Sequence, residues 1–100
     1  MLPANNAAAG VPEPDKLIGN YVTRVEIIHG AINVTFGNFV NKMAEGHIVT
    51  LQPIVVKDSP ASPMSWRCGY REVPKGMEAA GENRTNLDRR YLPTSCRSMS

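Results

Sequence analysis

Apolar residues recur along two consecutive segments of the chain, and in the second they alternate with polar residues. Residues 21–28 (YVTRVEII) are rich in β-branched side chains, and residues 31–37 (AINVTFG) alternate apolar and polar positions. A period of two residues is typical of a strand that buries one face. His29 and Gly30 separate the two segments by a short turn. The pattern therefore predicts an antiparallel β-hairpin.

Two further segments predict strands. Residues 48–52 (IVTLQ) begin a third strand, which Pro53 is expected to stop or to hold at a sheet edge, because proline has no backbone N–H. The run 57–63 (KDSPASP) has turn composition, and residues 65–70 (SWRCGY) predict a fourth strand. Short connections favour an antiparallel meander. The expected fold class is α+β, mainly β, with a four-stranded sheet.

The remaining segments carry little regular pattern. Helix-forming residues occur only in the short stretches 4–9, 39–45 and 77–80, and residues 38–46 could hold one helical turn or a broad loop. Residues 71–90 (REVPKGMEAAGENRTNLDRR) show no period. An irregular segment of this length is uncommon in a small domain unless it is functional or tied down.

The predicted sheet lacks a covering layer. Its apolar residues should lie largely on one face: Tyr21, Val25, Ile27, Ile32, Val34, Phe36, Val49, Leu51 and Trp66. A sheet needs a second layer to bury such a face. We expect one of three solutions: residues 4–9 fold back over the face, two copies pair face to face, or a helix binds from another chain.

Composition fits one small globular domain. The chain has 100 residues, of which 42% are hydrophobic and 20% charged, so general disorder is excluded. The net charge of +2 is uneven: residues 1–66 carry −1 and residues 67–100 carry +3. This excess is too mild to predict a general nucleic-acid binder. The sequence shows no signal peptide and no apolar run near the roughly 18 residues that span a membrane, so we expect a soluble chain.

The two cysteines, Cys68 and Cys96, do not have CxxC spacing. That spacing argues against a zinc site or a thioredoxin-like centre. Two alternatives remain, a pair of unrelated buried thiols and a disulfide. We favour the disulfide, because Cys96 lies where a chain end would otherwise fray. A disulfide implies an oxidising compartment.

No catalytic arrangement is visible. His29 and His47 flank a turn and a strand and are expected to be exposed, and the serines lack a GxSxG context. We therefore expect no enzyme activity, no cofactor and no metal site. Two N-x-T tripeptides begin at Asn33, in a predicted strand, and at Asn83, in a loop, and we favour neither as a glycan acceptor.

Several stretches, in their order and spacing, resemble one protein family. They are LPANNAAAGV, IGNYVTRVEI, GAINVTFGN, GHIVTLQP, MSWRCG, VPKGM and YLPTSCR, and together they cover nearly all of residues 2–97. The chain resembles the globular headgroup of type IV pilins of the IVa class. The resemblance implies a headgroup over residues 1–100, with a helix-to-sheet loop at 1–20, the sheet at 21–70 and a disulfide-bounded D-region at 68–96. Leu92 and Pro93 would anchor that loop, and Cys96 would close it.

The chain departs from the family at its start. Type IV pilins begin with a long apolar helix, whose first half anchors the protein in the membrane and whose second half packs on the sheet. The resemblance thus implies either a truncated form or a naturally split pilin. Other pilin subunits are the implied partners, through that helix. The implied role is a structural subunit of an extracellular pilus, held in the inner membrane or periplasm before assembly and serving adhesion, twitching motility and sometimes DNA uptake.

The basic C-terminal third suggests an alternative. Lys75, Arg84, Arg89 and Arg90 are candidate surface-binding residues, and a minor, DNA-receptor pilin would use them to contact DNA. A simply solvated loop is the competing interpretation, since few aromatic residues are available to stack on bases. Some related pilins carry an O-linked glycan on a C-terminal serine, which makes Ser100 a candidate acceptor. The VPKGM segment favours a major pilin.

Overall fold

The protein forms a single layer of antiparallel sheet. The computed structural model describes residues 2–38, 40–58 and 64–98. All its strands belong to one sheet, and its Cα atoms extend over 42 × 36 × 16 Å. The strands are β1 (Val22–Ile28), β2 (Ala31–Phe36), β3 (Ile48–Val56), β4 (Ser65–Cys68) and β5 (Met77–Ala79). Three 3₁₀ turns accompany them: η1 (Pro14–Lys16), η2 (Arg89–Tyr91) and η3 (Thr94–Cys96).

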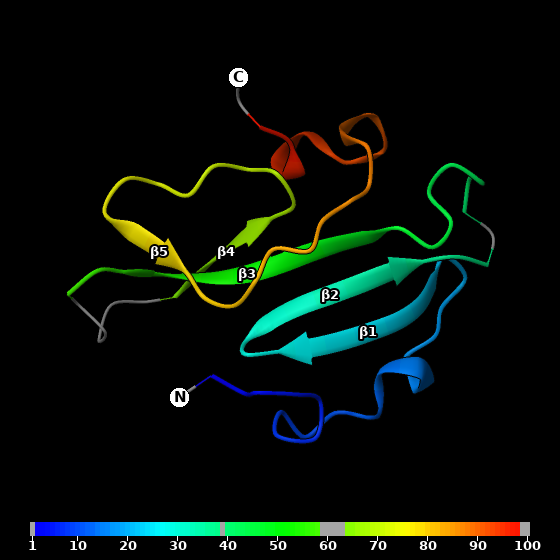
Figure 1. Ribbon diagram of the computed structural model, residues 1–100, viewed down its shortest axis with the longest axis horizontal. Helices are drawn as coiled ribbons and strands as arrows, with labels where there is room; N and C mark the ends of the chain where they lie inside the picture. The colour runs from blue at the N-terminus through cyan, green and yellow to red at the C-terminus, as the bar shows by residue number, and fades with distance from the viewer. Residues whose placement is uncertain (1, 39, 59–63, 99–100) are drawn as a thin grey trace.

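The predicted meander is confirmed. The first four strands pair in the order β1-β2-β3-β4, each antiparallel to the next (Figure 1). At the β1–β2 turn both His29 (φ 48°) and Gly30 (φ 87°) have positive φ, the conformation that tight hairpin turns require. The turn fixes the register, so Ile27 lies opposite Ile32 and Val25 opposite Val34. Directly opposed residues share a face, so these four apolar side chains lie together.

The expectation that Pro53 ends or edges the third strand is wrong, because β3 continues through it to Val56. Pro53 lies opposite Trp66 of β4, and on its other side its carbonyl accepts a hydrogen bond of 2.9 Å from the Ala80 N–H. The Ala80 carbonyl, which a residue with an N–H would have bound in return, accepts instead from Gln52 Nε2 at 3.3 Å. The neighbouring side chain thus replaces the missing donor.

A fifth strand lies where the sequence showed no regular pattern. The helix-forming stretch 77–80 is not helical; Met77–Ala79 form β5 and pair with β3. The pairing of β2 with β3 ends at Leu51, so the second half of β3 has an open edge on that side. β5 occupies this edge, with Ala79 opposite Ile54. The backbone groups of β3, rather than local propensity, decide the structure here.

The other helix-forming stretches form turns. Residues 4–10 make a bend and a turn, and so do the described residues of 38–46; Phe39 lies outside the described residues. The N-terminal segment runs along the outer edge of β1 (Figure 1). Its Asn6 is 4% exposed, accepts from the Ile27 N–H through Oδ1 and donates to the Val25 carbonyl through Nδ2. Residues 4–9 therefore cover an edge, so of the three solutions expected for the apolar face, the fold-back of this segment is the one that the structure contradicts.

Candidate functional site

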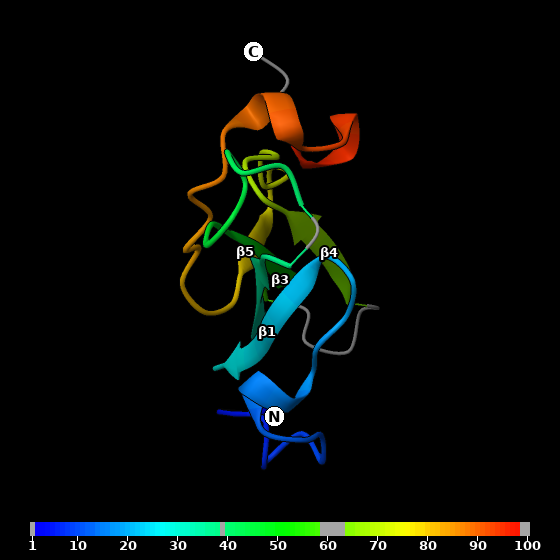
Figure 2. The same ribbon diagram turned by 90° about the vertical axis from the view of Figure 1, so that its right-hand side faces the viewer.

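Two features of the structure could carry function: the disulfide-closed C-terminal region and the apolar face of the sheet. Figure 2 shows the C-terminal region and the N-terminal segment at opposite ends of the molecule. The disulfide joins Cys68, the last residue of β4, to Cys96 in η3, with an S–S distance of 2.01 Å and a sequence separation of 28. The expected bond is thus present.

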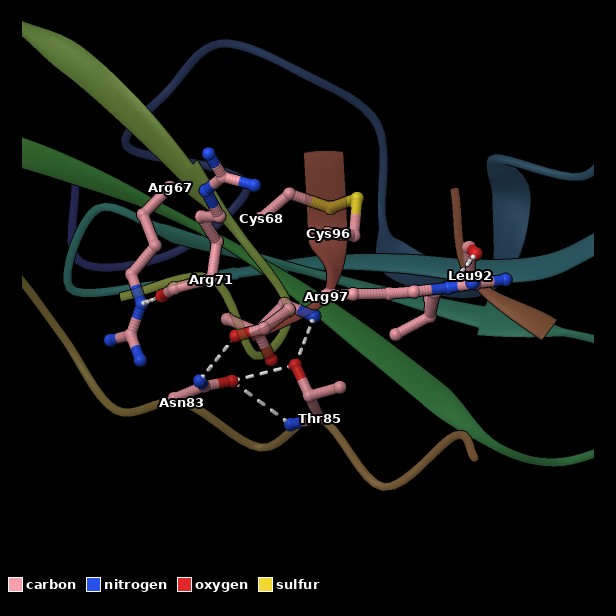
Figure 3. The surroundings of a disulfide bond; sticks show 10 residues. Arg67, Cys68, Arg71, Asn83, Thr85, Leu92, Cys96 and Arg97 are labelled. Atoms are coloured by element: carbon pink, nitrogen blue, oxygen red, sulfur yellow. Dashed lines mark hydrogen bonds between the residues drawn. A yellow bond between two sulfur atoms is a disulfide. The ribbon is translucent and has the colours of Figure 1, made fainter. Parts of the chain in front are cut away.

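The backbone beside the disulfide needs a glycine. Gly69 has φ +55°, and a Cβ there would lie 2.9 Å from the Cys96 carbonyl oxygen. The next residue, Tyr70, donates its N–H to that same carbonyl at 2.9 Å. η3 therefore lies directly against the end of β4, and Figure 3 shows this arrangement around the disulfide. The last residues of the chain are tied by a covalent bond and by a backbone hydrogen bond.

The disulfide-closed region also contributes to the core. Leu87 (2% exposed), Leu92 (4%) and Cys96 (6%) form one buried cluster with Ala44 and Val49. Leu92 is thus an anchor, as the resemblance implied. Pro93 is not: it is exposed and precedes η3 with φ −63°. Its fixed φ suits the residue that precedes the turn η3, and its side chain is not part of the buried cluster.

A buried polar network holds the segment 80–86 across the sheet. Thr50, 1% exposed, donates through its hydroxyl to Asn33 Oδ1 at 2.6 Å and accepts from the Arg84 N–H at 2.9 Å. The Thr50 N–H in turn donates to the Thr85 hydroxyl at 2.9 Å. The Asn83 side chain donates to the Gly69 carbonyl at 2.8 Å (Figure 3). Residues 80–86 thus provide hydrogen-bond partners that a neighbouring strand would otherwise provide along this part of β3.

Sequence reasoning missed the residues of this network. Thr50, Gln52 and Asn33 are polar strand residues that the structure buries, and hydrophobic periodicity gave no reason to expect them in the interior. The sequence did contain a signal for these buried polar residues: three polar side chains lie on one side of the central strands, and a loop rich in Asn and Thr can bond to them. That signal does not say which loop crosses. Arg97 was missed as well; its Nε donates to the Leu92 carbonyl at 2.8 Å and fixes the chain after the disulfide.

The four candidate basic residues come from three separate segments. Arg84 pairs with Glu82 at 3.7 Å, and Arg90 pairs with Asp88 at 3.3 Å. Arg89 in η2 and Lys75 in the loop before β5 are exposed and form no ion pair within the described part of the chain. Exposed ion pairs of this kind contribute little to stability, so the paired arginines remain accessible to other anions. Ser100 lies outside the described residues and stays a prediction.

Asp88 caps η2. Its carboxylate accepts from the Arg90 backbone N–H at 3.0 Å and from Arg90 Nε at 3.3 Å. The pKa of Asp88 is lowered from its ordinary value of 3.8, chiefly by the backbone hydrogen bond from Arg90, with the charges of Arg90 and Arg89 adding to it. The Arg90 side chain also lies over the Tyr91 ring, 6.0 Å from its centroid. This end of the region is a locally ordered, charged surface.

The register places most of the predicted apolar residues on one face. Opposed pairs and alternation bring together Val25, Ile27, Ile32, Val34, Phe36, Val49, Leu51 and Trp66. Val34, Phe36 and Val49 pack against the cluster of Leu87 and Leu92. The others are only partly buried, and Trp66 remains 52% exposed. The region between the cysteines therefore covers one end of the face and leaves the rest open.

The described residues contain no group of three or more histidine, cysteine or acidic side chains that could hold a metal ion. None of the helices in this part of the chain is long and apolar enough to cross a membrane. What the described structure does offer is a tethered surface region on a sheet with a partly open apolar face. That combination fits a structural or binding module.

Comparison with known proteins agrees with this class. The family model for pilin, a bacterial filament protein, matches residues 1–97. The chain is 33% identical over 101 residues to the type IV major pilin protein PilE1 of Neisseria gonorrhoeae, a match that covers 95% of this chain and 54% of PilE1. It is 30% identical over 107 residues to a fimbrial protein of Neisseria meningitidis serogroup B, covering 98% of this chain and 61% of that protein. The chain belongs to the pilin family, and it spans about half the length of these relatives.

Proposed function

We propose that this chain is the headgroup of a structural subunit of a type IV pilus, exposed on the surface of an extracellular filament. The observation that carries the proposal is the combination of family membership with a disulfide-closed region at one end of a single-layer sheet. The family is one of filament proteins and not of enzymes. Residues 1–20, 21–70 and 68–96 then serve as loop, sheet and exposed D-region of one headgroup.

The open part of the apolar face supports assembly with a helix. Val25, Ile27, Ile32 and Leu51 form a continuous, partly exposed apolar surface of the sheet. Burying one large aliphatic side chain stabilises a protein by about 1.5–3 kcal/mol, so several of them favour a covering element strongly. An amphipathic helix, which presents one apolar stripe, fits a flat sheet face. In a type IV pilin subunit that helix also joins neighbouring subunits in the filament.

The deciding experiment deletes the gene in its own bacterium and examines the cell surface by electron microscopy. We expect loss of surface filaments, of twitching motility and of attachment, all restored by the wild-type gene. Antibody against this chain should label wild-type filaments along their length. A complementing gene with Ile32→Asp should fail, whereas Glu78→Lys, an exposed position on β5, should restore filaments. Unlabelled filaments in normal numbers after deletion would refute a structural role.

A minor, DNA-receptor pilin is the second candidate. It is favoured by Arg89 and Lys75, which are exposed and form no ion pair within the described ranges. In that case gene deletion would leave filaments intact and abolish DNA uptake. Purified protein would bind duplex DNA with an affinity that falls steeply as salt rises, because phosphate contacts release counterions. The double variant Arg89→Gln/Lys75→Gln would reduce the slope of that salt dependence.

A further inference from the structure

A groove lies beside the outer edge of β4. The chain leaves β4, arches over that edge through residues 71–76 and then enters β5 (Figure 1). The groove has a volume of about 530 Å³, within the range of small-molecule sites. Arg67, Arg71 and Trp66 line it from the strand and the arch, and Thr94 and Ser95 line it from η3. The disulfide, which fixes η3 against β4, therefore also fixes two sides of the groove.

The lining of the groove carries two guanidinium groups, those of Arg67 and Arg71, and one carboxylate, that of Glu72, so one positive charge remains in excess. Arg67 is held in place by two neutral acceptors, the Arg71 carbonyl at 2.5 Å and Gln52 Oε1 at 2.9 Å. Neither Arg67 nor Arg71 forms an ion pair within the described chain. Figure 3 shows their side chains pointing in opposite directions, so the two guanidinium groups do not converge on one point. The acidic residue of the lining, Glu72, already accepts a hydrogen bond from the Ser98 hydroxyl.

The rest of the lining is amphipathic. Ile54, Pro74 and Met77 supply an apolar side, and the half-exposed indole of Trp66 adds a flat aromatic surface. The hydroxyl groups of Thr94 and Ser95 can both donate and accept hydrogen bonds. A bare anion would leave the apolar side unused, and an aliphatic ligand would leave the guanidinium group of Arg71 without a partner. The lining suits a ligand with one anionic group, several hydroxyl groups and a C–H face.

We propose that this groove binds an acidic saccharide, a sugar ring that carries a carboxylate. The carboxylate pairs with a guanidinium group, which forms planar, bidentate contacts with carboxylates. The ring hydroxyls bond to Thr94 and Ser95, and the C–H face packs on Trp66 or Met77. Because Arg67 and η3 are already held by hydrogen bonds and by the disulfide, little ordering is needed on binding.

The test is an NMR titration of the ¹⁵N-labelled chain with methyl β-glucuronide, with methyl β-glucoside as the matched neutral sugar and with inorganic phosphate. The glucuronide should give saturable shifts confined to residues 65–77 and 94–96, with a Kd about tenfold lower than that of the glucoside or of phosphate. Equal shifts from phosphate would make this a simple anion site and overturn the proposal. So would the absence of saturable shifts with the glucuronide.

Variants localise the binding. Arg71→Gln should raise the Kd for the glucuronide about tenfold and leave that for the glucoside unchanged, because only the charged contact is lost. The Arg71 side chain makes no hydrogen bond or ion pair within the described residues, so this variant should fold normally. Arg90→Gln, in η2 and outside the groove lining, is the charge-matched control and should bind as the wild type does. A loss with Arg90→Gln equal to that with Arg71→Gln would refute the assignment.

Discussion

Removing the disulfide should cost this domain a large part of its stability. The double variant Cys68→Ala/Cys96→Ala opens a loop of 28 residues without burying a hydroxyl group. In the chain-entropy treatment, closing a loop of this length lowers the entropy of the unfolded chain by about 12 cal/mol/K, or about 3.6 kcal/mol at 25 °C. Unfolding of a 100-residue domain carries an entropy of about 0.21 kcal/mol/K near its midpoint, so the Tm should fall by about 17 °C.

The loss should begin locally. The Tyr70 N–H donates to the Cys96 carbonyl at 2.9 Å, and this contact depends on η3 staying against β4. Leu92, 4% exposed in the core cluster, still holds the preceding residues after the disulfide is gone. In the variant we therefore expect fast amide exchange at Tyr70, while amides in the centre of β2 and β3 stay protected up to global unfolding.

The assays are thermal and urea unfolding followed by circular dichroism, with hydrogen exchange by NMR as the local probe. Wild-type protein in a reducing agent is the matched control and should behave as the double variant does. A stability loss below about 1 kcal/mol, with the sheet intact, would show that the loop-closure reasoning does not apply. Exchange that rises equally at Tyr70 and in β2 would refute the local part.

Two further predictions concern polar groups. Thr50→Val should lower the free energy of unfolding in urea by about 2–4 kcal/mol, because it leaves Asn33 Oδ1 and the Arg84 N–H without their partner. Thr35→Val, at a partly exposed position, is the control and should change this free energy by less than about 0.5 kcal/mol. Equal effects of the two variants would contradict the network. The pKa of Asp88, measured by NMR, should lie below 3.8. Because this pKa is lowered in the folded protein, the contribution of Asp88 to stability is present at neutral pH and is lost as the pH falls through the folded pKa. Asp88→Asn should remove this dependence of stability on acid pH, and an unshifted Asp88 pKa would contradict the capping contact.

The sequence predicts the parts of this fold that local pattern determines. The alternation in residues 31–37, the His29-Gly30 turn and the short connections were enough to predict the meander. The disulfide could be argued from the position of Cys96 near the chain end. These predictions succeed because strand period, turn conformation and loop length all act within a few residues.

The predictions that the structure contradicts concern places where contacts between residues distant in sequence decide the fold. β3 continues through Pro53 because the Gln52 side chain donates a hydrogen bond to the Ala80 carbonyl, 28 residues away in sequence. β5 forms because the second half of β3 has an open edge, although Met77 and its neighbours have no strand pattern of their own. Asn6 attaches the N-terminal segment to β1 through one side chain, which composition does not reveal. Tertiary hydrogen bonding outweighs local propensity at each of these places.

The polar network beneath residues 80–86 has a consequence for how this surface can vary between strains. Substitutions at Asn83 or Thr85 disturb bonds to the buried backbone and side chain of β3, so selection should hold these residues in place. Residues 71–76 arch over an edge without such bonds to β3, so insertions there lengthen a surface loop at little free-energy cost. The disulfide-closed region is thus divided into a fixed half and a variable half. A diversifying filament surface would accumulate its differences in the arch, the same segment that borders the proposed saccharide groove.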